Sequence, residues 1–146
     1  MNDPDCIVVS KRIKSKAMPE APVTDDEMLF HATAIVASGG MMLDGDDYTG
    51  LTPAQKARLR KTLPPTNRPA RFASEDFREG RAELPDGRTL VFVFNWDDAA
   101  RPHRVQLAGR RRLRDFWTDA DLGTHSAYDI ASLPPHSARL LVATSV

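Results

Sequence analysis

The first half of the chain alternates short apolar runs with helix-like segments. Cys6-Ile7-Val8-Val9 is a β-branched run typical of one buried strand, and Met41-Met42-Leu43 is a second run of this kind. Residues 25–37 are apolar on nearly every side, which favours a helix that is buried on more than one face. A second helix is expected from residue 53 to about residue 63. The order strand, helix, strand, helix is typical of a unit with parallel strands.

Both predicted helices begin and end with recognisable signals. Thr24 and Glu27 have the spacing of a capping box, in which each side chain accepts a hydrogen bond from the other residue's backbone N–H. Thr52 and Gln55 have the same spacing, with a proline at the first helical position. Gly39, just after the first helix, is the residue type that most often ends one.

The second half has the pattern of an antiparallel β-sandwich. A proline-rich linker over residues 63–69 divides the chain. Residues 81–84 and 89–94 read as two strands around the turn Pro85-Asp86-Gly87. Three more short strands are expected, over residues 103–107, 111–116 and 138–143. Two parallel strands cannot form a sheet with both faces covered, so the first half is expected to be the remnant of a larger α/β body.

Composition narrows the function classes. The chain has 146 residues, 41% hydrophobic and 27% charged, with 20 basic side chains balancing 20 acidic ones. This neutral balance argues against binding to nucleic acid or to an anionic membrane. Cys6 is the only cysteine, so no internal disulfide forms, which fits a reducing compartment. With no signal peptide or membrane-spanning stretch in view, a cytoplasmic protein is expected, although a missing upstream part would take any signal with it.

Four short segments occur in a characteristic order. They are Asn2-Asp3-Pro4-Asp5-Cys6, Ala37-Ser38-Gly39-Gly40-Met41-Met42-Leu43, Leu51-Thr52-Pro53 and Phe94-Asn95-Trp96. In this order they resemble the C-terminal portion of α-galactosidases (melibiases), which are retaining glycoside hydrolases with a (β/α)8 TIM barrel followed by a β-sandwich. The resemblance implies that residues 1–66 are the end of the catalytic barrel and residues 67–146 the antiparallel β-sandwich domain.

The resemblance also implies a substrate site. In the family, the Asn-Asp-Pro-Asp motif lies at the C-terminal face of a late barrel strand, beside the galactose pocket, and barrel enzymes keep their chemistry at that face. Asp3, Asp5 and Cys6 are therefore expected to be substrate-binding residues that form one wall of this pocket. The implied ligand is an α-galactoside carbohydrate, and no cofactor is expected.

The chain is not expected to hold the catalytic residues. Retaining hydrolysis needs two carboxyl groups about 5 Å apart. In the family both are aspartates upstream of the Asn-Asp-Pro-Asp motif, so no residue of this chain is predicted to be catalytic. Met1 stands inside the motif, which suggests a truncated fragment or a mis-started reading frame. Such a fragment would be inactive alone, and its partner would be the missing barrel portion or a second copy through the apolar helix at residues 25–37.

Several other residues allow a functional or a structural interpretation. Asp44-Gly45-Asp46-Asp47 lacks the glycine and glutamate of a calcium loop, so a solvated loop and no metal site are favoured. Arg110-Arg111-Arg112-Leu113-Arg114 is either a phosphate site or, more plausibly, an exposed sheet edge. His136 is expected to be a turn residue. Trp96 and Trp117 either form a sugar-stacking platform or lie in the sandwich core, which is favoured.

Two further functions remain open at this stage. One is a stand-alone carbohydrate-binding or accessory module built on the sandwich. The other is half of a split hydrolase, which an upstream and separately encoded barrel portion would complete.

Overall fold

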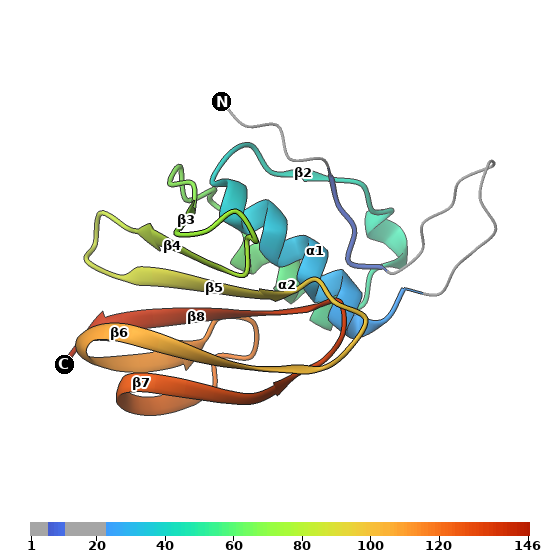
Figure 1. Ribbon diagram of the computed structural model, residues 1–146. Coiled ribbons are helices and arrows are strands. Elements are labelled where there is room, and N and C mark those ends of the chain that lie inside the picture. Colours follow the sequence, from blue (N-terminus) through green and yellow to red (C-terminus); the bar gives the residue numbers. More distant parts are fainter. Residues whose placement is uncertain (1–5, 11–22) are drawn as a thin grey trace.

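The computed structural model describes residues 6–10 and 23–146 of the chain (Figure 1). A small parallel strand pair and two helices lie on one side of a larger antiparallel sheet. The long helix α1 lies between the strand pair and the sheet. No helix in these described ranges is long and apolar enough to cross a membrane.

The predicted strand, helix, strand, helix unit is confirmed in its order. Strand β1 (Cys6–Ile7) pairs in parallel with β2 (Leu43–Asp44), and Cys6 lies opposite Leu43. Helix α1 (Asp25–Ser38) connects them. A 3-10 turn, η1 (Tyr48–Gly50), and helix α2 (Pro53–Lys61) follow. The strands are shorter than the apolar runs that predict them. Two strands and two helices do not establish a TIM barrel, so the barrel remains a prediction.

The helix signals act as the sequence predicts. The Thr24 hydroxyl accepts from the Glu27 backbone N–H at 3.1 Å, and the Thr24 N–H donates to the Glu27 carboxylate at 2.8 Å. Thr52 and Gln55 form the second capping box. Gly39 ends α1 in the left-handed conformation, with φ of 64°. These ends are fixed by local hydrogen bonds, which is why the sequence locates them well.

The larger sheet has six strands in the order β3-β4-β5-β8-β6-β7, and all neighbouring strands are antiparallel. The strand bounds are β3 (Arg71–Phe72), β4 (Glu79–Glu83), β5 (Thr89–Asn95), β6 (Arg101–Asp115), β7 (Asp121–Leu133) and β8 (Ser137–Ser145). β6 was expected as two separate strands, and β3 and β7 were not expected.

The sheet folds over itself to form two layers. The pairing of β6 with β7 shifts register between Gln106 and Arg111. Beyond this irregularity, β6 pairs with β8. Before it, β6 covers the far face of β5, where Val105 shares a fully buried cluster with Val91 and Val93. The antiparallel β-sandwich expected from the sequence is therefore confirmed, with one continuous sheet supplying both layers (Figure 1).

Helix α1 belongs to two apolar cores. Val36 and Ala37 pack on Phe92 and its neighbours in the sheet. Met28 and Ile35 pack on the other side, in a cluster with Ile7 of β1. The predicted burial on more than one face is confirmed. The expectation that the apolar faces of this helix would lack partners is wrong, because the sheet and the strand pair cover them.

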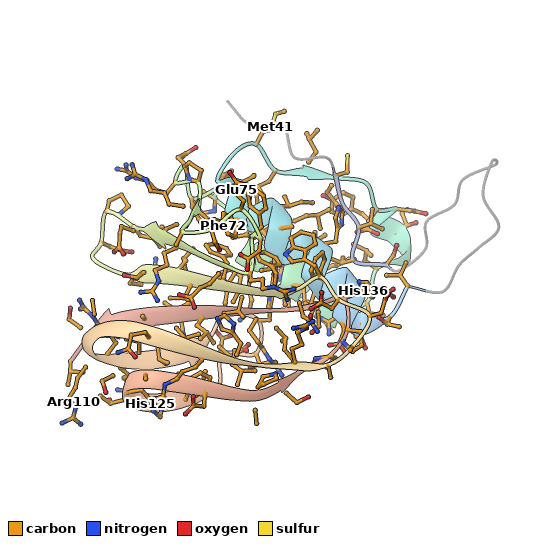
Figure 2. All side chains as sticks on the ribbon, viewed as in Figure 1. Met41, Phe72, Glu75, Arg110, His125 and His136 are labelled. Atoms are coloured by element: carbon orange, nitrogen blue, oxygen red, sulfur yellow. The ribbon has the colours of Figure 1, made fainter. Side chains whose placement is uncertain are left out.

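The predicted sheet edge at Arg110–Arg114 is also wrong. These residues lie in β6, which has β7 on one side and β8 on the other, while β3 and β7 form the edges. The side chains are nevertheless at the surface: Arg112 pairs with Asp121 at 2.7 Å and Arg114 with Asp119 at 3.5 Å. Arg110 extends outward from β6, next to the point where its register with β7 shifts (Figure 2). The unrecognised strand β7 supplies the true edge.

Candidate functional site

Of the three predicted substrate-binding residues, the structure describes Cys6. Asp3 and Asp5 lie outside the described residues. Cys6 is half-buried at the start of β1 and lies beside Gly45, the residue that follows β2. A Cβ atom on Gly45 would come within 3.4 Å of that of Cys6. The contact of Cys6 with a sugar remains a prediction.

A carboxylate closes the parallel strand pair at its carboxyl end. Asp46 accepts a hydrogen bond from the Val9 N–H at 2.7 Å and another from the Ser10 N–H at 3.0 Å. Gln55 at the start of α2 donates to the Val9 carbonyl at 3.1 Å. These bonds tie the chain after β1 to the loop after β2. Asp46 therefore organises the backbone at the carboxyl end of the strand pair.

The other acidic residues of this loop have local structural partners. Asp47 accepts from the Thr49 N–H at 3.0 Å and from its hydroxyl at 2.7 Å. Asp44 accepts from the Asp46 N–H at 3.2 Å. Hydrogen bonding to Asp44, together with burial, raises the pKa of Tyr48. Within residues 6–10 and 23–146, no three His, Cys, Asp or Glu side chains gather as a metal site would require.

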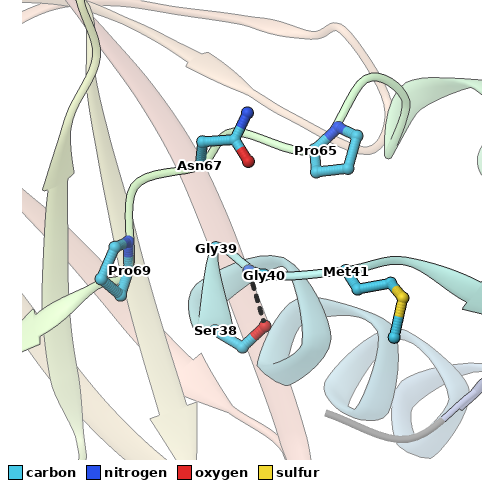
Figure 3. A pocket seen from close by; sticks show the side chains of 7 residues that line it. All are labelled: Ser38, Gly39, Gly40, Met41, Pro65, Asn67 and Pro69. Atoms are coloured by element: carbon cyan, nitrogen blue, oxygen red, sulfur yellow. Dashed lines mark hydrogen bonds between the residues drawn. The ribbon is translucent and has the colours of Figure 1, made fainter. Parts of the chain in front are cut away.

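A cavity of about 470 Å³ opens where α1 ends (Figure 3). Its walls come from the end of α1 and from the proline-rich linker: Ser38, Gly39, Gly40, Met41, Pro65, Asn67 and Pro69. The Ser38 hydroxyl donates to the Ile35 carbonyl at 2.7 Å and accepts from the Gly40 N–H at 3.2 Å. The Ser38 hydroxyl thus already donates one hydrogen bond and accepts another, and Asn67 is the other polar side chain in the wall.

An aromatic groove of about 370 Å³ adjoins this cavity and includes Phe72, Phe77 and Trp96. Trp96 is 45% exposed, so its expected place in the sandwich core is wrong. Its ring stands edge-on to Phe30 at 4.6 Å, and its indole N–H donates to the Phe77 carbonyl at 3.1 Å. Trp117 does pack on the core, as favoured. The groove is almost wholly apolar.

A half-buried ionic group joins the two sandwich layers. Glu79 of β4 contacts Arg81 at 2.6 Å and His103 of β6 at 2.8 Å. Burial raises the pKa of Glu79, but the hydrogen bonds from His103 and Arg81 outweigh it, so the pKa lies below its ordinary value. This group fixes β6 over β4.

His136 lies in the turn between β7 and β8, as expected of a turn residue. Its φ is 47°, and its imidazole contacts Asp98 at 2.8 Å (Figure 2). A residue group that the sequence did not predict lies in the cleft between β7 and β8, where Asp115, Tyr128 and Arg139 meet. The pairing of β6 with β8 brings Asp115 close to Arg139, and the pairing of β6 with β7 adds Tyr128.

Comparison with known families identifies the sandwich. Residues 81–143 match the family described as the alpha galactosidase C-terminal beta sandwich domain. This stretch is similar to a melibiase C-terminal domain. It covers the strands from β4 to β8, so the family assignment rests on the sandwich and agrees with the resemblance that the short motifs indicated.

Solved structures extend the similarity over the rest of the chain. A proposed α-galactosidase/melibiase from Bacteroides fragilis has a TM-score of 0.78 at 18% identity, over 98% of this chain and 34% of its own. α-Galactosidase I from Mortierella vinacea has a TM-score of 0.66 at 17% identity, over 87% and 37%. α-Galactosidase from Saccharomyces cerevisiae, solved with raffinose, has a TM-score of 0.64 at 12% identity, over 93% and 45%.

The chain thus spans about a third to under half of the length of these structures. At these identities the likeness shows a common fold. The common fold includes the parallel strand pair and its helices together with the sandwich. No curated protein matches the chain in sequence.

Proposed function

We propose that this chain serves as the C-terminal portion of an α-galactosidase-type glycoside hydrolase that acts on terminal α-galactosides. One observation carries the proposal: a parallel strand pair with its two helices stands directly before a melibiase C-terminal domain. The same succession is superimposable on a proposed α-galactosidase/melibiase over 98% of this chain.

In this role β1 and β2 would be two neighbouring strands of a barrel. β1 and β2 are parallel, which is the arrangement of neighbouring strands in a (β/α)8 barrel. The hydrogen bonds that Asp46 accepts from Val9 and Ser10 hold the backbone at the carboxyl ends of these strands. Barrel enzymes bind substrate at this end of their strands. Cys6 begins β1 and Asp3 and Asp5 precede it in the sequence. By the resemblance these three residues would contribute to the wall of the sugar pocket.

The melibiase C-terminal domain would support this strand pair by packing against α1. Its sheet covers one side of α1, while β1 and α2 cover the other. The position of the strand pair is therefore set by the sandwich through a shared helix. This arrangement supports a scaffold role for the domain.

We further propose that the chain alone does not cleave α-galactosides, because the family's two catalytic aspartates lie upstream of the Asn-Asp-Pro-Asp motif. The test is an assay of the purified chain with p-nitrophenyl α-galactoside, with an active melibiase as the positive control. No release of nitrophenol is expected. Turnover that co-purifies with the chain and disappears in both Asp3→Ala and Asp5→Ala would overturn the proposal of inactivity.

A further inference from the structure

The sandwich contains a cleft of about 520 Å³ where its two layers separate. β7 is an edge strand, and the pairing of β6 with β8 ends at Leu141. Arg139 lies beyond that last pair, on a stretch of β8 that pairs only with β5. The side chains that define the cleft are Asp115, Thr118, Tyr128, Ser132, Arg139 and Leu141. Its size is within the range of small-molecule sites, which is roughly 300–1,000 Å³.

A carboxylate is held rigidly in the wall of this cleft. Asp115 is only 6% exposed. One of its oxygens, Oδ1, accepts from the Trp117 N–H at 3.0 Å, the Thr118 N–H at 2.9 Å and the Thr118 hydroxyl at 2.9 Å. The other oxygen, Oδ2, is 3.8 Å from Arg139. Three donors thus fix the carboxylate and leave Oδ2 as an acceptor toward the cleft.

A guanidinium group stands across from this acceptor. The Arg139 side chain is 49% exposed. Within the described part of the chain, its ion pair with Asp115 is longer than a hydrogen bond, at 3.8 Å. A guanidinium carries five N–H donors in a planar fork. The cleft therefore presents a fixed acceptor beside a set of donors, the combination that neighbouring hydroxyl groups satisfy.

The remaining walls are aromatic and aliphatic. Tyr128 is half-buried and packs against the apolar cluster of the second layer. Leu122, Ile130 and Leu141 line the same space. Asp129 also borders it, but its carboxylate is engaged by Arg104 through two contacts of 2.9 Å. One guanidinium and one carboxylate then face the ligand, so the local charge is balanced.

We propose that this cleft binds a pyranose ring of a neutral carbohydrate, with Asp115 and Arg139 bonding adjacent hydroxyls and Tyr128 and Leu122 contacting the apolar side of the ring. The balanced charge disfavours a simple anion, which would meet the Asp115 and Asp129 carboxylates. The mixed polar and apolar walls fit a ligand with hydroxyl edges and a C–H face. This site lies in the sandwich and does not depend on the hydrolase function proposed above.

The test is a ¹H–¹⁵N NMR titration of the full chain with D-galactose and with melibiose, and separately with sodium sulfate. The sugars are expected to shift the amides of residues 128–132 and of Thr118, with a millimolar Kd. Arg139→Gln and Tyr128→Ala are each expected to weaken binding at least about tenfold, or about 1.4 kcal/mol. Arg88→Gln, at the β4–β5 turn, is the matched control and is expected to leave the Kd unchanged.

Three results would overturn the proposal. They are the absence of shifts at the solubility limit of both sugars, shifts confined to the aromatic groove around Trp96, and saturable binding of sulfate with none of sugar. Tyr128 supports the second-layer core, so its variant is compared with wild type by its spectrum outside the cleft. If Tyr128→Ala does not fold, the half-exposed Arg139→Gln decides the question, and an unchanged Kd there contradicts the site.

Discussion

The indole N–H of Trp117 donates to the hydroxyl of Thr33 at 2.9 Å, across 84 residues of sequence. Thr33 is fully buried in α1, and Trp117 follows β6 in the sandwich. This bond is therefore a polar contact inside the apolar interface between the helix and the sandwich. It fixes the rotation of α1 on the sheet in a way that apolar packing alone would not.

Replacing Thr33 with valine should destabilise the protein by about 1–3 kcal/mol, the cost of leaving a buried donor unsatisfied. Valine keeps the shape of threonine, so no cavity contributes to the loss. Urea unfolding followed by tryptophan fluorescence measures the effect. Thr124→Val, at an exposed position of β7, is the control and should remain within about 0.5 kcal/mol of wild type. Equal stabilities of the two variants would show that the Trp117 bond contributes nothing.

Removing the Asp46 carboxylate should open the end of β1. Asp46→Ala deprives the Val9 and Ser10 amides of their acceptor, at a cost of about 1–3 kcal/mol. Hydrogen–deuterium exchange of these two amides should become faster than in wild type. Asp47→Ala removes a neighbouring carboxylate that caps η1, and should leave both amides protected. Unchanged exchange in Asp46→Ala would mean that Asp46 does not form these two hydrogen bonds in solution.

Gly39→Ala should disrupt the packing of the end of α1 against the linker. Its φ of 64° alone costs a non-glycine residue about 1–2 kcal/mol. The added Cβ would also come closer than 3.0 Å to backbone atoms of Arg68 and Pro69, which should add about 1–3 kcal/mol of overpacking.

Gly87 separates these two effects. It also has a positive φ, 83°, but no atom lies within 4 Å of an added Cβ. Gly87→Ala should therefore cost only the backbone part. Thermal unfolding of both variants measures the difference, and a Gly39→Ala variant no less stable than Gly87→Ala would contradict the close approach of the linker.

The Glu79 group makes stability depend on pH in acid. The pKa of Glu79 is lowered in the folded state from its ordinary value of 4.5. The folded protein therefore binds this proton less readily than the unfolded chain, and the stabilisation is fully present above the unfolded pKa. It is lost as the pH falls from about 4.5 through the lowered pKa. The stability difference between wild type and Glu79→Gln, measured by urea unfolding, should shrink over this window.

A stability difference that stays constant from neutral pH into this acidic window would contradict the ionic link between Glu79 and its partners. Glu83→Gln is a suitable control. This glutamate lies on the same strand, β4, and accepts a hydrogen bond from Thr89 at 2.7 Å without contacting the inter-layer group.

Local signals in the sequence were sufficient for the helices. The ends of α1 and α2 depend on bonds within four residues, as between Thr24 and Glu27, so a sequence pattern specifies them. The two apolar faces of α1 could be recognised, but not what covers them. That depends on the distant contact of Val36 with the sheet.

The sandwich was predictable where its strands are buried and apolar, as in β5. Strand β7 escaped recognition because it is an edge strand rich in small and polar residues, with few buried positions. Without β7, the arginines at residues 110–114 look like an edge. The cleft that contains Arg139 also cannot be anticipated, because it exists only where β7 and β8 diverge. The sugar-pocket residues Asp3 and Asp5 remain predictions from the resemblance.

The two-sided burial of α1 also constrains motion. A hinge between the strand pair and the sandwich would have to separate α1 either from Ile7 or from Phe92, exposing an apolar surface in both cases. Relative rotation of the two parts is therefore opposed throughout the native state. Any displacement of the sandwich, for instance on binding a large ligand, would be transmitted through α1 to the loop that holds Asp46.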